Sequence, residues 1–181
     1  MIQQAANLIK NSKKPILYVG GGIIHSKANK ELFDLATKFN IPVVTTLMGR
    51  GAFPDGHELC LEMPGMHGNY TATTSIQKSD LLIAIGVRFD DRVTANPSFF
   101  AQNAKVIHAD IDPAEIGKVR EAQVPIVGDA KSVILGLIDA LQDEELDTKN
   151  WINELNSMKT EHPLSYNQDE NGPLKVPFVL E

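Results

Sequence analysis

The sequence has little cysteine, and this scarcity bounds where the protein works. Its one cysteine in 181 residues, Cys60, has no partner for an intramolecular disulfide, which favours a reducing, intracellular setting over secretion. No signal peptide is evident, and no apolar run approaches the ~20 residues that a membrane helix requires. Clusters of Lys and Arg are also missing, and the formal net charge is −6, which argues against nucleic acid as the main partner. We therefore expect a soluble protein with neither a membrane nor a nucleic-acid partner.

Several catalytic motifs are missing as well. The sequence has no G-x-S-x-G elbow for an acyl-transfer serine, no Walker A loop and no paired Cys or His spacing for zinc. Four carboxylates lack a recognised metal-binding spacing, and ion pairing with neighbouring arginines is an equally good explanation for the first two. These carboxylates are Asp90, Asp91, Asp110 and Asp112, and the arginines are Arg88 and Arg92. We therefore predict neither a catalytic residue nor a metal ligand within this chain.

Apolar runs and helical patterns alternate along the chain, and this alternation predicts the fold. The composition, 43% hydrophobic and 22% charged, is ordinary for one domain with a substantial core. Helix-like spacing recurs between the apolar runs, for example over residues 27–39, where Ser26 is a candidate cap. We predict an α/β fold: a doubly wound, six-stranded parallel sheet with helices on both faces. The six expected strands are residues 16–19, 42–46, 59–63, 81–85, 105–111 and 124–127.

The stretch from Ser79 to Thr94, SDLLIAIGVRFDDRVT, is the strongest candidate for a site. Leu81 to Ile85 is a continuous apolar run, as expected of a parallel strand covered on both faces. At Gly86 the character changes, and two arginines and two aspartates follow it. Ligands of open α/β sheets bind where the carboxyl ends of the strands emerge, so we expect the site here.

Gly20-Gly21-Gly22 follows the first expected strand and partly matches a dinucleotide-binding fingerprint. That fingerprint requires G-x-G-x-x-G and an acidic residue about 20 positions later to hold a ribose. His25 occupies the third glycine position, and residues 41–48 contain no acid, so a nicotinamide cofactor bound in the usual way is disfavoured. Two interpretations stay open: a tight strand-to-helix turn, or bare backbone N–H groups that approach a phosphate or adenosine.

Further candidates lie in loops near the other strands. His67 belongs to a Gly- and Pro-rich loop before a helix expected at residues 70–78, where it either meets free backbone donors or is merely structural or solvated. Asp110, at the end of a strand, is a candidate for hydrogen bonds with a ribose or another diol. We assign helix capping to Asp112, which precedes a proline, and favour capping for Asp129 too. On residues alone, the chain is a module that binds phosphate and ribose, with the cofactor unidentified.

Four motifs follow one another along the chain: MPGMHGN, IGVRFDDRVT, HADIDPAEIGK and VGDA. Together they closely resemble the central domain of the acetolactate synthase (acetohydroxyacid synthase) catalytic-subunit family. The resemblance covers residues 2–141, and the tail from EHPLSY onward is similar to the linker that leads into the third domain of that enzyme. It implies a Rossmann-like central domain at residues 1–145 that binds FAD. Residues 146–181 are then expected to be a linker towards an absent C-terminal thiamine-diphosphate-binding domain.

The resemblance also implies an activity for the parent enzyme. That family condenses two pyruvates, or pyruvate with 2-oxobutyrate, to 2-acetohydroxy acids with loss of CO2, in branched-chain amino-acid biosynthesis. This carboligation uses thiamine diphosphate and Mg²⁺, and the flavin has no net redox role. It needs an activating Glu from an N-terminal domain and a Gly-Asp-Gly…Asn segment from a C-terminal domain. Neither occurs here, because Gly128-Asp129 is followed by Ala130, so we expect the fragment to be inactive alone.

By motif, the resemblance implies which residues surround the cofactor. Asp91 and Arg92 match family residues near the substrate channel, where herbicide inhibitors also bind. Ala95 departs from the family, which usually has a glycine after the threonine. The implied FAD contacts are Gly20, Gly21, Gly22, Thr46, Leu47, Met48, Met66, His67, Gly68, Asn69, Gly86, Val87, Arg88, Asp90, Val93, Asp110, Ile111, Gly128, Asp129 and Ala130.

Partners and location follow from the same resemblance. We expect contacts with other domains of the same subunit, and a homo-oligomer that associates with a regulatory small subunit. A bacterial cytoplasm is the favoured location, and a plastid is the alternative. A second function also stays open: a stand-alone nucleotide-binding or interaction module that has kept the fold and lost its cofactor.

Overall fold

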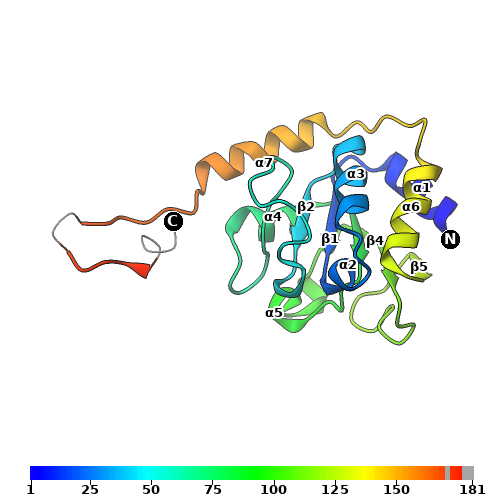
Figure 1. Ribbon diagram of the computed structural model, residues 1–181, viewed down its shortest axis with the longest axis horizontal. Coiled ribbons are helices and arrows are strands. Elements are labelled where there is room, and N and C mark those ends of the chain that lie inside the picture. The colour runs from blue at the N-terminus through cyan, green and yellow to red at the C-terminus, as the bar shows by residue number, and fades with distance from the viewer. Residues whose placement is uncertain (170–171, 177–181) are drawn as a thin grey trace.

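The computed structural model describes residues 1–169 and 172–176, and a parallel β-sheet forms its centre (Figure 1). Five strands pair in the order β2-β1-β3-β4-β5, all of them parallel. Every residue of β1 and of β3 is buried, as expected where helices cover both faces of a sheet. The strands are β1 (Pro15–Val19), β2 (Val43–Thr45), β3 (Leu81–Ile85), β4 (Lys105–Asp110) and β5 (Val124–Val127).

The predicted α/β architecture is confirmed, but its sixth strand is wrong. Residues 59–63 run beside β2 and pair with it at one position only, a parallel bridge between Val43 and Cys60. The Leu61 N–H donates to the Val43 carbonyl at 2.9 Å. Glu62 then has a φ of 66°, which bends the backbone out of the extended conformation that a strand requires.

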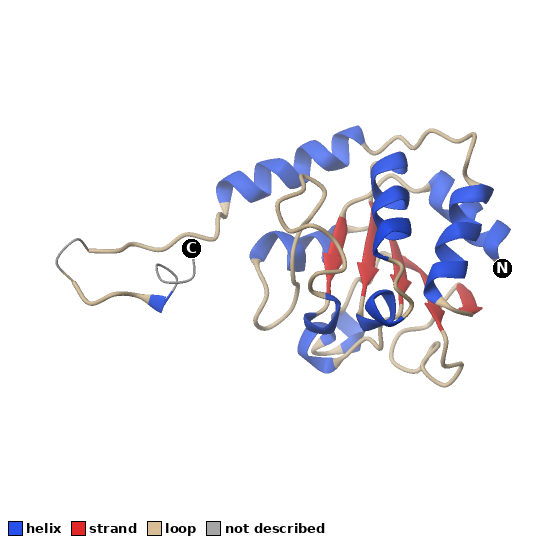
Figure 2. Cartoon of the chain, in the orientation of Figure 1, coloured by secondary structure: helices blue, strands red, loops and turns tan. Residues whose placement is uncertain are grey.

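The strand order decides which face each helix covers (Figure 2). The chain passes from β1 to its neighbour β2 and then crosses back to β3, on the other side of β1. Because crossovers between parallel strands are right-handed, these two connections place their helices on opposite faces. One face carries α1 (Ile2–Asn11), α3 (Asn29–Phe39) and α6 (Ala130–Ala140), and the other carries α4 (Tyr70–Lys78) and α7 (Lys149–Glu161).

Short helices follow the carboxyl ends of the strands. One of them, α2 (Gly21–His25), is not among the predicted helices, and α3 begins at Asn29 instead of Lys27. Ser26 therefore ends α2, with its hydroxyl donating to the Ile23 carbonyl at 3.2 Å, and does not cap α3 as predicted. In the described part of the chain, every helix falls short of the length and apolar character needed to span a bilayer. The other short helices are η1 (Leu47–Gly49), α5 (Asp91–Thr94) and η2 (Pro97–Phe99).

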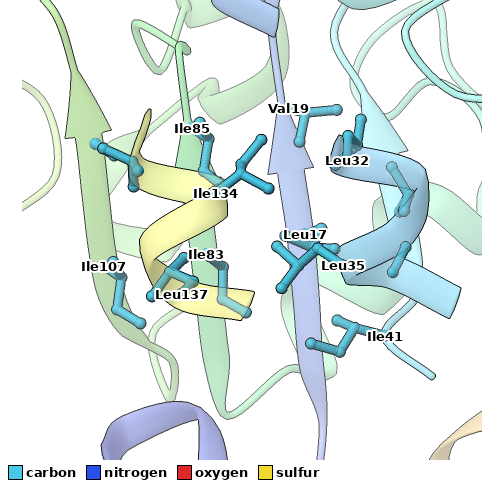
Figure 3. Close-up of a cluster of buried hydrophobic side chains, with 14 of the residues drawn as sticks. Leu17, Val19, Leu32, Leu35, Ile41, Ile83, Ile85, Ile107, Ile134 and Leu137 are labelled. Carbon is cyan, nitrogen blue, oxygen red and sulfur yellow. The ribbon is translucent and has the colours of Figure 1, made fainter. Parts of the chain in front are cut away.

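Figure 3 shows how the first face of the sheet is packed. Strand side chains point toward α3 and α6, whose apolar side chains interdigitate with them. Close packing of this kind holds the strands rigidly, so the loops at their ends start from fixed positions. The layer includes Leu17, Val19, Leu32, Leu35, Ile41, Ile83, Ile85, Ile107, Ile134 and Leu137, each with no exposed surface.

On the second face α7 closes the core, although it lies in the range predicted to be a linker. Trp151 is 1% exposed, and its indole N–H donates to the Pro15 carbonyl at 3.2 Å. Glu154 pairs with Lys14 at 2.7 Å and with Lys78 at 3.0 Å. Beyond α7 the chain runs away from the body (Figure 1). The domain boundary stays a prediction, and residues beyond it contribute to the core.

Candidate functional site

The carboxyl ends of β1 and β3 lie where the winding of the sheet changes direction. These strands are neighbours, yet the chain leaves β1 toward β2 and leaves β3 toward β4. In doubly wound sheets this divergence opens the crevice in which ligands bind. The loops after the two strands begin at Gly20 and Gly86, two of the glycines that the sequence singles out.

Gly20, Gly22 and Gly86 pack backbone against backbone at this point. The Gly20 N–H donates to the Ile85 carbonyl and the Gly22 N–H to the Gly86 carbonyl, each at 3.2 Å. A Cβ atom on Gly20 would lie 2.3 Å from the Gly86 oxygen, and one on Gly22 would lie 2.6 Å from the Gly86 Cα. The tight-turn interpretation is confirmed, because two of the N–H groups are bonded within the protein. Gly21, between them, stays partly exposed.

The segment after β3 alternates between buried and exposed side chains. Val87 and Phe89 are each 2% exposed, whereas Arg88 and Asp90 are exposed. Asp90 caps α5 by accepting the Arg92 N–H at 3.0 Å, and this bond lowers the pKa of its carboxyl. The Arg88 guanidinium makes no hydrogen bond or ion pair in the described part of the chain. It is therefore free to meet an anion.

Asp91 and Arg92 lie next to each other at the start of α5. Arg92 Nη1 is 2.8 Å from Asp91 Oδ2, and the side chains are 68% and 72% exposed. The ion pairing predicted for this aspartate is confirmed. A pair this exposed contributes little to stability, so both groups remain accessible to a polar molecule at this edge.

Phe89 anchors the segment, and it was not identified from the sequence. Its ring makes edge-on contacts, with centroid distances of 5.6 Å to Tyr18, 5.0 Å to His108 and 6.1 Å to Phe100. Its φ is 53°, an unfavourable conformation for a bulky residue, which these contacts stabilise. The sequence does carry a signal, because V-R-F-D alternates apolar and charged residues, as a chain with one side on the core does.

His108 is a second residue that was not identified from the sequence. It has no exposed surface within β4, and its Nε2 lies 2.9 Å from the Val87 carbonyl oxygen. Burial lowers the pKa of the imidazole, which favours the neutral form. Its Nδ1 and the Tyr18 hydroxyl lack hydrogen-bond partners in the described part of the chain, and burial raises the pKa of Tyr18. The sequence does offer one signal for this residue, because a histidine inside the apolar run of an expected strand is unusual.

The loop after β2 places apolar side chains at the same edge. Thr46 precedes η1, and its hydroxyl accepts the Gly49 N–H at 3.1 Å. Leu47 and Met48 are 71% and 69% exposed. A Cβ atom on Gly49 would lie 2.8 Å from the Val19 oxygen, so this loop packs directly on the end of β1. Two large apolar side chains are thus exposed on a capped turn, close to the carboxyl end of β1.

The MPGMHGN loop joins the RFDDRVT segment. The Met66 N–H donates to the Arg92 carbonyl at 3.0 Å. A Cβ atom on Gly65, whose φ is 97°, would lie 2.9 Å from the Val93 Cα. Met66 itself is 72% exposed. Two motifs that are separate in the sequence therefore form one surface beside α5.

The end of this loop positions α4. A Cβ atom on Gly68 would lie 2.1 Å from a backbone oxygen of the same loop, which keeps the turn tight. Asn69 caps α4, because its Oδ1 accepts the Ala72 N–H at 2.6 Å and its Nδ2 donates to the Leu61 carbonyl at 3.1 Å. His67 is exposed two residues earlier and has no hydrogen bond in the described part of the chain. Asn69, and not His67, meets the free donors of the helix.

The ends of β4 and β5 meet at a second part of the edge. The Gly128 N–H donates to the Asp110 carbonyl at 2.9 Å. Asp110 Oδ1 accepts the Asp112 N–H at 2.9 Å, which holds this carboxylate at the end of its strand. Asp129 caps α6 as predicted, by accepting the Ser132 N–H at 3.1 Å.

The segment after Asp110 corrects one prediction. Asp112 accepts the Ala114 N–H at 2.9 Å, but turns follow it and the predicted helix is absent. Gly117 has a φ of 77° and interrupts the chain before helical turns can accumulate. Ile111 is 72% exposed, whereas Ala130 is 7% exposed and belongs to the core.

The carboxyl edge of the sheet thus combines three chemistries. It has exposed apolar side chains, a guanidinium without a partner in the described residues, and a carboxylate fixed at the end of a strand. Figure 1 shows α2 and α5 at the edge where the strands end. Among residues 1–169 and 172–176, no three His, Cys, Asp or Glu side chains gather in a way that could hold a metal ion. The apolar side chains are Leu47, Met48, Met66 and Ile111, and the charged ones are Arg88 and Asp110.

Comparison with protein families matches residues 2–137 to the family described as the thiamine pyrophosphate enzyme central domain. The match covers most of the chain, including the glycine turn, both loops beside α5 and the cap of α6. This chain belongs to that family. The predicted resemblance to a central domain of this kind is confirmed.

Several relatives of this chain are named acetolactate synthases. Acetolactate synthase of Mycobacterium leprae is 53% identical over 99% of this chain, which corresponds to 29% of the relative. The large subunit of Corynebacterium glutamicum is 50% identical over 99% of the chain and 29% of its own length. The chloroplastic acetolactate synthase 1 of Nicotiana tabacum is 47% identical over 92% of the chain and 25% of its own length. The chain therefore spans less than a third of these relatives.

Proposed function

We propose that this chain is the central, FAD-binding domain of an acetolactate synthase large subunit. The names of its relatives support the enzyme, and the carboxyl edge of the sheet supports the cofactor. One observation carries the cofactor proposal. Four large apolar side chains are 69–72% exposed on the same edge as the unpartnered guanidinium of Arg88, within the described residues: Leu47, Met48, Met66 and Ile111.

The chemistry of this edge fits a flavin dinucleotide. Flat rings match the exposed apolar side chains, and a pyrophosphate matches the Arg88 guanidinium, which suits phosphate geometry. A ribose diol matches the carboxylate of Asp110 at the end of β4, which one backbone N–H already orients at 2.9 Å. When bound, the flavin has no net redox role in the reaction we propose.

Some of the implied cofactor residues act through the backbone. The side chain of Asn69 is committed to capping α4, and Asp129 is committed to capping α6. We propose that these two hold loops that pass near FAD. The loops after β1 and β3 pack directly against each other, because the glycines at their contact have no side chains: Gly20, Gly22 and Gly86.

The reaction of the parent enzyme is also a proposal. It is the condensation of two pyruvates, or of pyruvate with 2-oxobutyrate, with loss of CO2, for branched-chain amino-acid synthesis. Thiamine diphosphate and Mg²⁺ are held by domains outside this chain, and Asp91 and Arg92 border the substrate channel from the exposed start of α5. We propose the other domains of the subunit, a second copy and a regulatory small subunit as partners. The proposed location is a bacterial cytoplasm, with a plastid as the alternative.

An FAD titration of the 181-residue chain tests the cofactor proposal. Flavin fluorescence reports binding, and thermal stability rises by mass action only if the folded state holds the ligand. We expect saturable binding that Arg88→Ala weakens by about tenfold or more, since a charge-assisted contact is lost. Lys105→Ala is the matched control, because it removes one exposed cation from the opposite end of β4, and it should leave the affinity unchanged.

Two outcomes would contradict the proposal. Absence of saturable binding would show that this chain does not hold FAD by itself, and it would favour a stand-alone module that has lost its cofactor. Acetolactate formation by the pure chain, supplied with pyruvate, thiamine diphosphate and Mg²⁺, would contradict the expected inactivity.

A further inference from the structure

We propose that His108 is a positioning residue that fixes how Arg88 is presented at the carboxyl edge of the sheet. This role is not assigned by the family or by the sequence motifs. The inference rests on the proposed function insofar as Arg88 contacts FAD. The contact between His108 and the loop does not depend on that proposal.

The geometry ties His108 to the residue before Arg88. Nε2 of His108 lies 2.9 Å from the Val87 carbonyl oxygen. A carbonyl oxygen only accepts hydrogen bonds, so Nε2 carries the proton and donates it. The Gly86 N–H, one residue earlier, donates to the Ala109 carbonyl at 2.8 Å. Adjacent residues of β4 therefore hold two successive residues of the loop.

The same imidazole also holds the residue after Arg88. The rings of His108 and Phe89 meet edge to face, with centroids 5.0 Å apart and planes at 85°. Phe89 is 2% exposed and has a φ of 53°, a conformation that its surroundings must maintain. Both neighbours of Arg88 are thus fastened to one side chain, and Arg88 itself is left facing solvent.

Packing alone does not explain a histidine at this position. His108 has no exposed surface, and its layer contains apolar neighbours such as Ala84 and Val106. Its Nδ1 has no hydrogen-bond partner within the described residues, and an unpaired buried polar atom is destabilising. An aliphatic side chain would fill the layer without that penalty. The donor at Nε2 is what an aliphatic side chain cannot supply.

Two substitutions of similar shape isolate the donor. His108→Gln keeps an N–H donor at the end of a flexible side chain, whereas His108→Met has similar length and no donor. We expect His108→Met to raise the dissociation constant of FAD by about fivefold to tenfold, the effect of one hydrogen bond. His108→Gln should stay closer to the unchanged chain. In an Arg88→Ala background His108→Met and His108→Gln should bind FAD equally, because the guanidinium that His108 positions is absent.

A destabilised control separates positioning from general loss of stability. Leu137→Ala removes a fully buried side chain from the opposite face of the sheet. It should lower stability and leave FAD affinity unchanged. If Leu137→Ala weakens FAD binding as much as His108→Met does, the effect of His108 is only structural and the proposal is overturned.

A second measurement needs no ligand and separates this inference from the proposed function. Trypsin cleaves after exposed arginines and lysines, so the rate of cleavage between Arg88 and Phe89 reports how firmly the loop is held. We expect faster cleavage of His108→Met than of His108→Gln at this bond, relative to cleavage after Lys27. If the unchanged chain does not bind FAD, the cofactor proposal fails, and the cleavage comparison still tests whether His108 positions the loop. Equal cleavage of His108→Met and His108→Gln would overturn the role of His108. Equal FAD affinity of these two variants would also overturn it, provided that Arg88→Ala weakens FAD binding.

Discussion

The amino and carboxyl edges of the sheet differ in how far their polar groups are satisfied within the protein. At the amino edge, the Asp80 carboxylate accepts the Lys13 N–H at 2.7 Å, the Lys14 N–H at 3.0 Å and the Ser12 hydroxyl. At the carboxyl edge, Arg88 makes no hydrogen bond or ion pair within the described residues, and large apolar side chains are exposed. Charges at the first edge hold the fold together, whereas those at the second remain available for a ligand.

Backbone conformation, by contrast, does not separate the two edges. Phe89 and Ala95, in the loop after β3, have φ values of 53° and 48°. Asn40, shortly before β2, and Ala101, shortly before β4, have φ values of 52° and 46°. Positive φ therefore occurs at both edges, and it is the unused side chains that mark the carboxyl edge.

The largest expected effect comes from breaking the amino edge. Trp151→Ala removes a side chain that is 1% exposed and donates to the Pro15 carbonyl at the start of β1. We expect a loss of about 3–5 kcal/mol in the free energy of unfolding, measured with urea. Leu135→Ala is the control, because Leu135 of α6 is 49% exposed, and it should change the free energy of unfolding by less than about 0.5 kcal/mol. A loss below about 1 kcal/mol for Trp151→Ala would show that α7 is not part of the core.

A charge removed from each edge compares the two directly. Asp80→Ala leaves three donors without their acceptor, and we expect a loss of about 2 kcal/mol in the free energy of unfolding. Arg88→Ala removes an exposed charge that makes no hydrogen bond or ion pair in the described part of the chain and should change it by less than about 0.5 kcal/mol. Equal losses, measured by denaturant unfolding, would mean that the carboxyl edge is as internally satisfied as the amino edge.

Relieving backbone strain should make the carboxyl edge more stable. Ala95 follows α5 with φ 48° and ψ −106°. We expect Ala95→Gly to raise the free energy of unfolding by about 0.5–1 kcal/mol, because glycine tolerates this conformation. Ala114→Gly, in a turn without positive φ, should lower it slightly. A loss of stability in Ala95→Gly would contradict the presence of strain at this residue.

The smallest expected effect concerns pH. Burial lowers the pKa of His108 in the folded state, against weaker opposing effects of Val87, Asp110 and Glu115, while the unfolded value is about 6.5. Between the lowered pKa and about 6.5 the unfolded chain binds more protons, so stability is full above this range and falls as the pH drops through it. His108→Gln should show a shallower fall between about pH 7.5 and pH 5.5 in denaturant unfolding. Parallel curves would show that His108 is not kept neutral by the fold.

Much of the fold could be predicted from local patterns. Leu81–Ile85 is apolar at every position, and the structure makes it the central strand β3. Residues 59–63 show how such patterns mislead, because they form only one bridge with β2, between Val43 and Cys60, and the positive φ of Glu62 ends the extended conformation. Whether an apolar segment becomes a strand depends on what pairs with it, and no local pattern carries that information.

The arrangement of the candidate site is less evident from the sequence than the fold. The motifs indicate Arg88, Asp110 and the glycines, and in the structure these residues lie at the carboxyl edge of the sheet. They do not identify Phe89 or His108, whose roles depend on rings and carbonyls from β1, β3 and β4 meeting in one layer. Residue spacing along the chain cannot show such a meeting.

The sequence by itself determined the class of fold and the family, because apolar periodicity and short motifs are local properties. The tertiary structure decided the rest. It showed that α7 completes the core and that Arg88 faces solvent between two buried neighbours. These features arise from contacts between residues distant in the chain, and folding selects them by burying apolar surface and pairing polar groups.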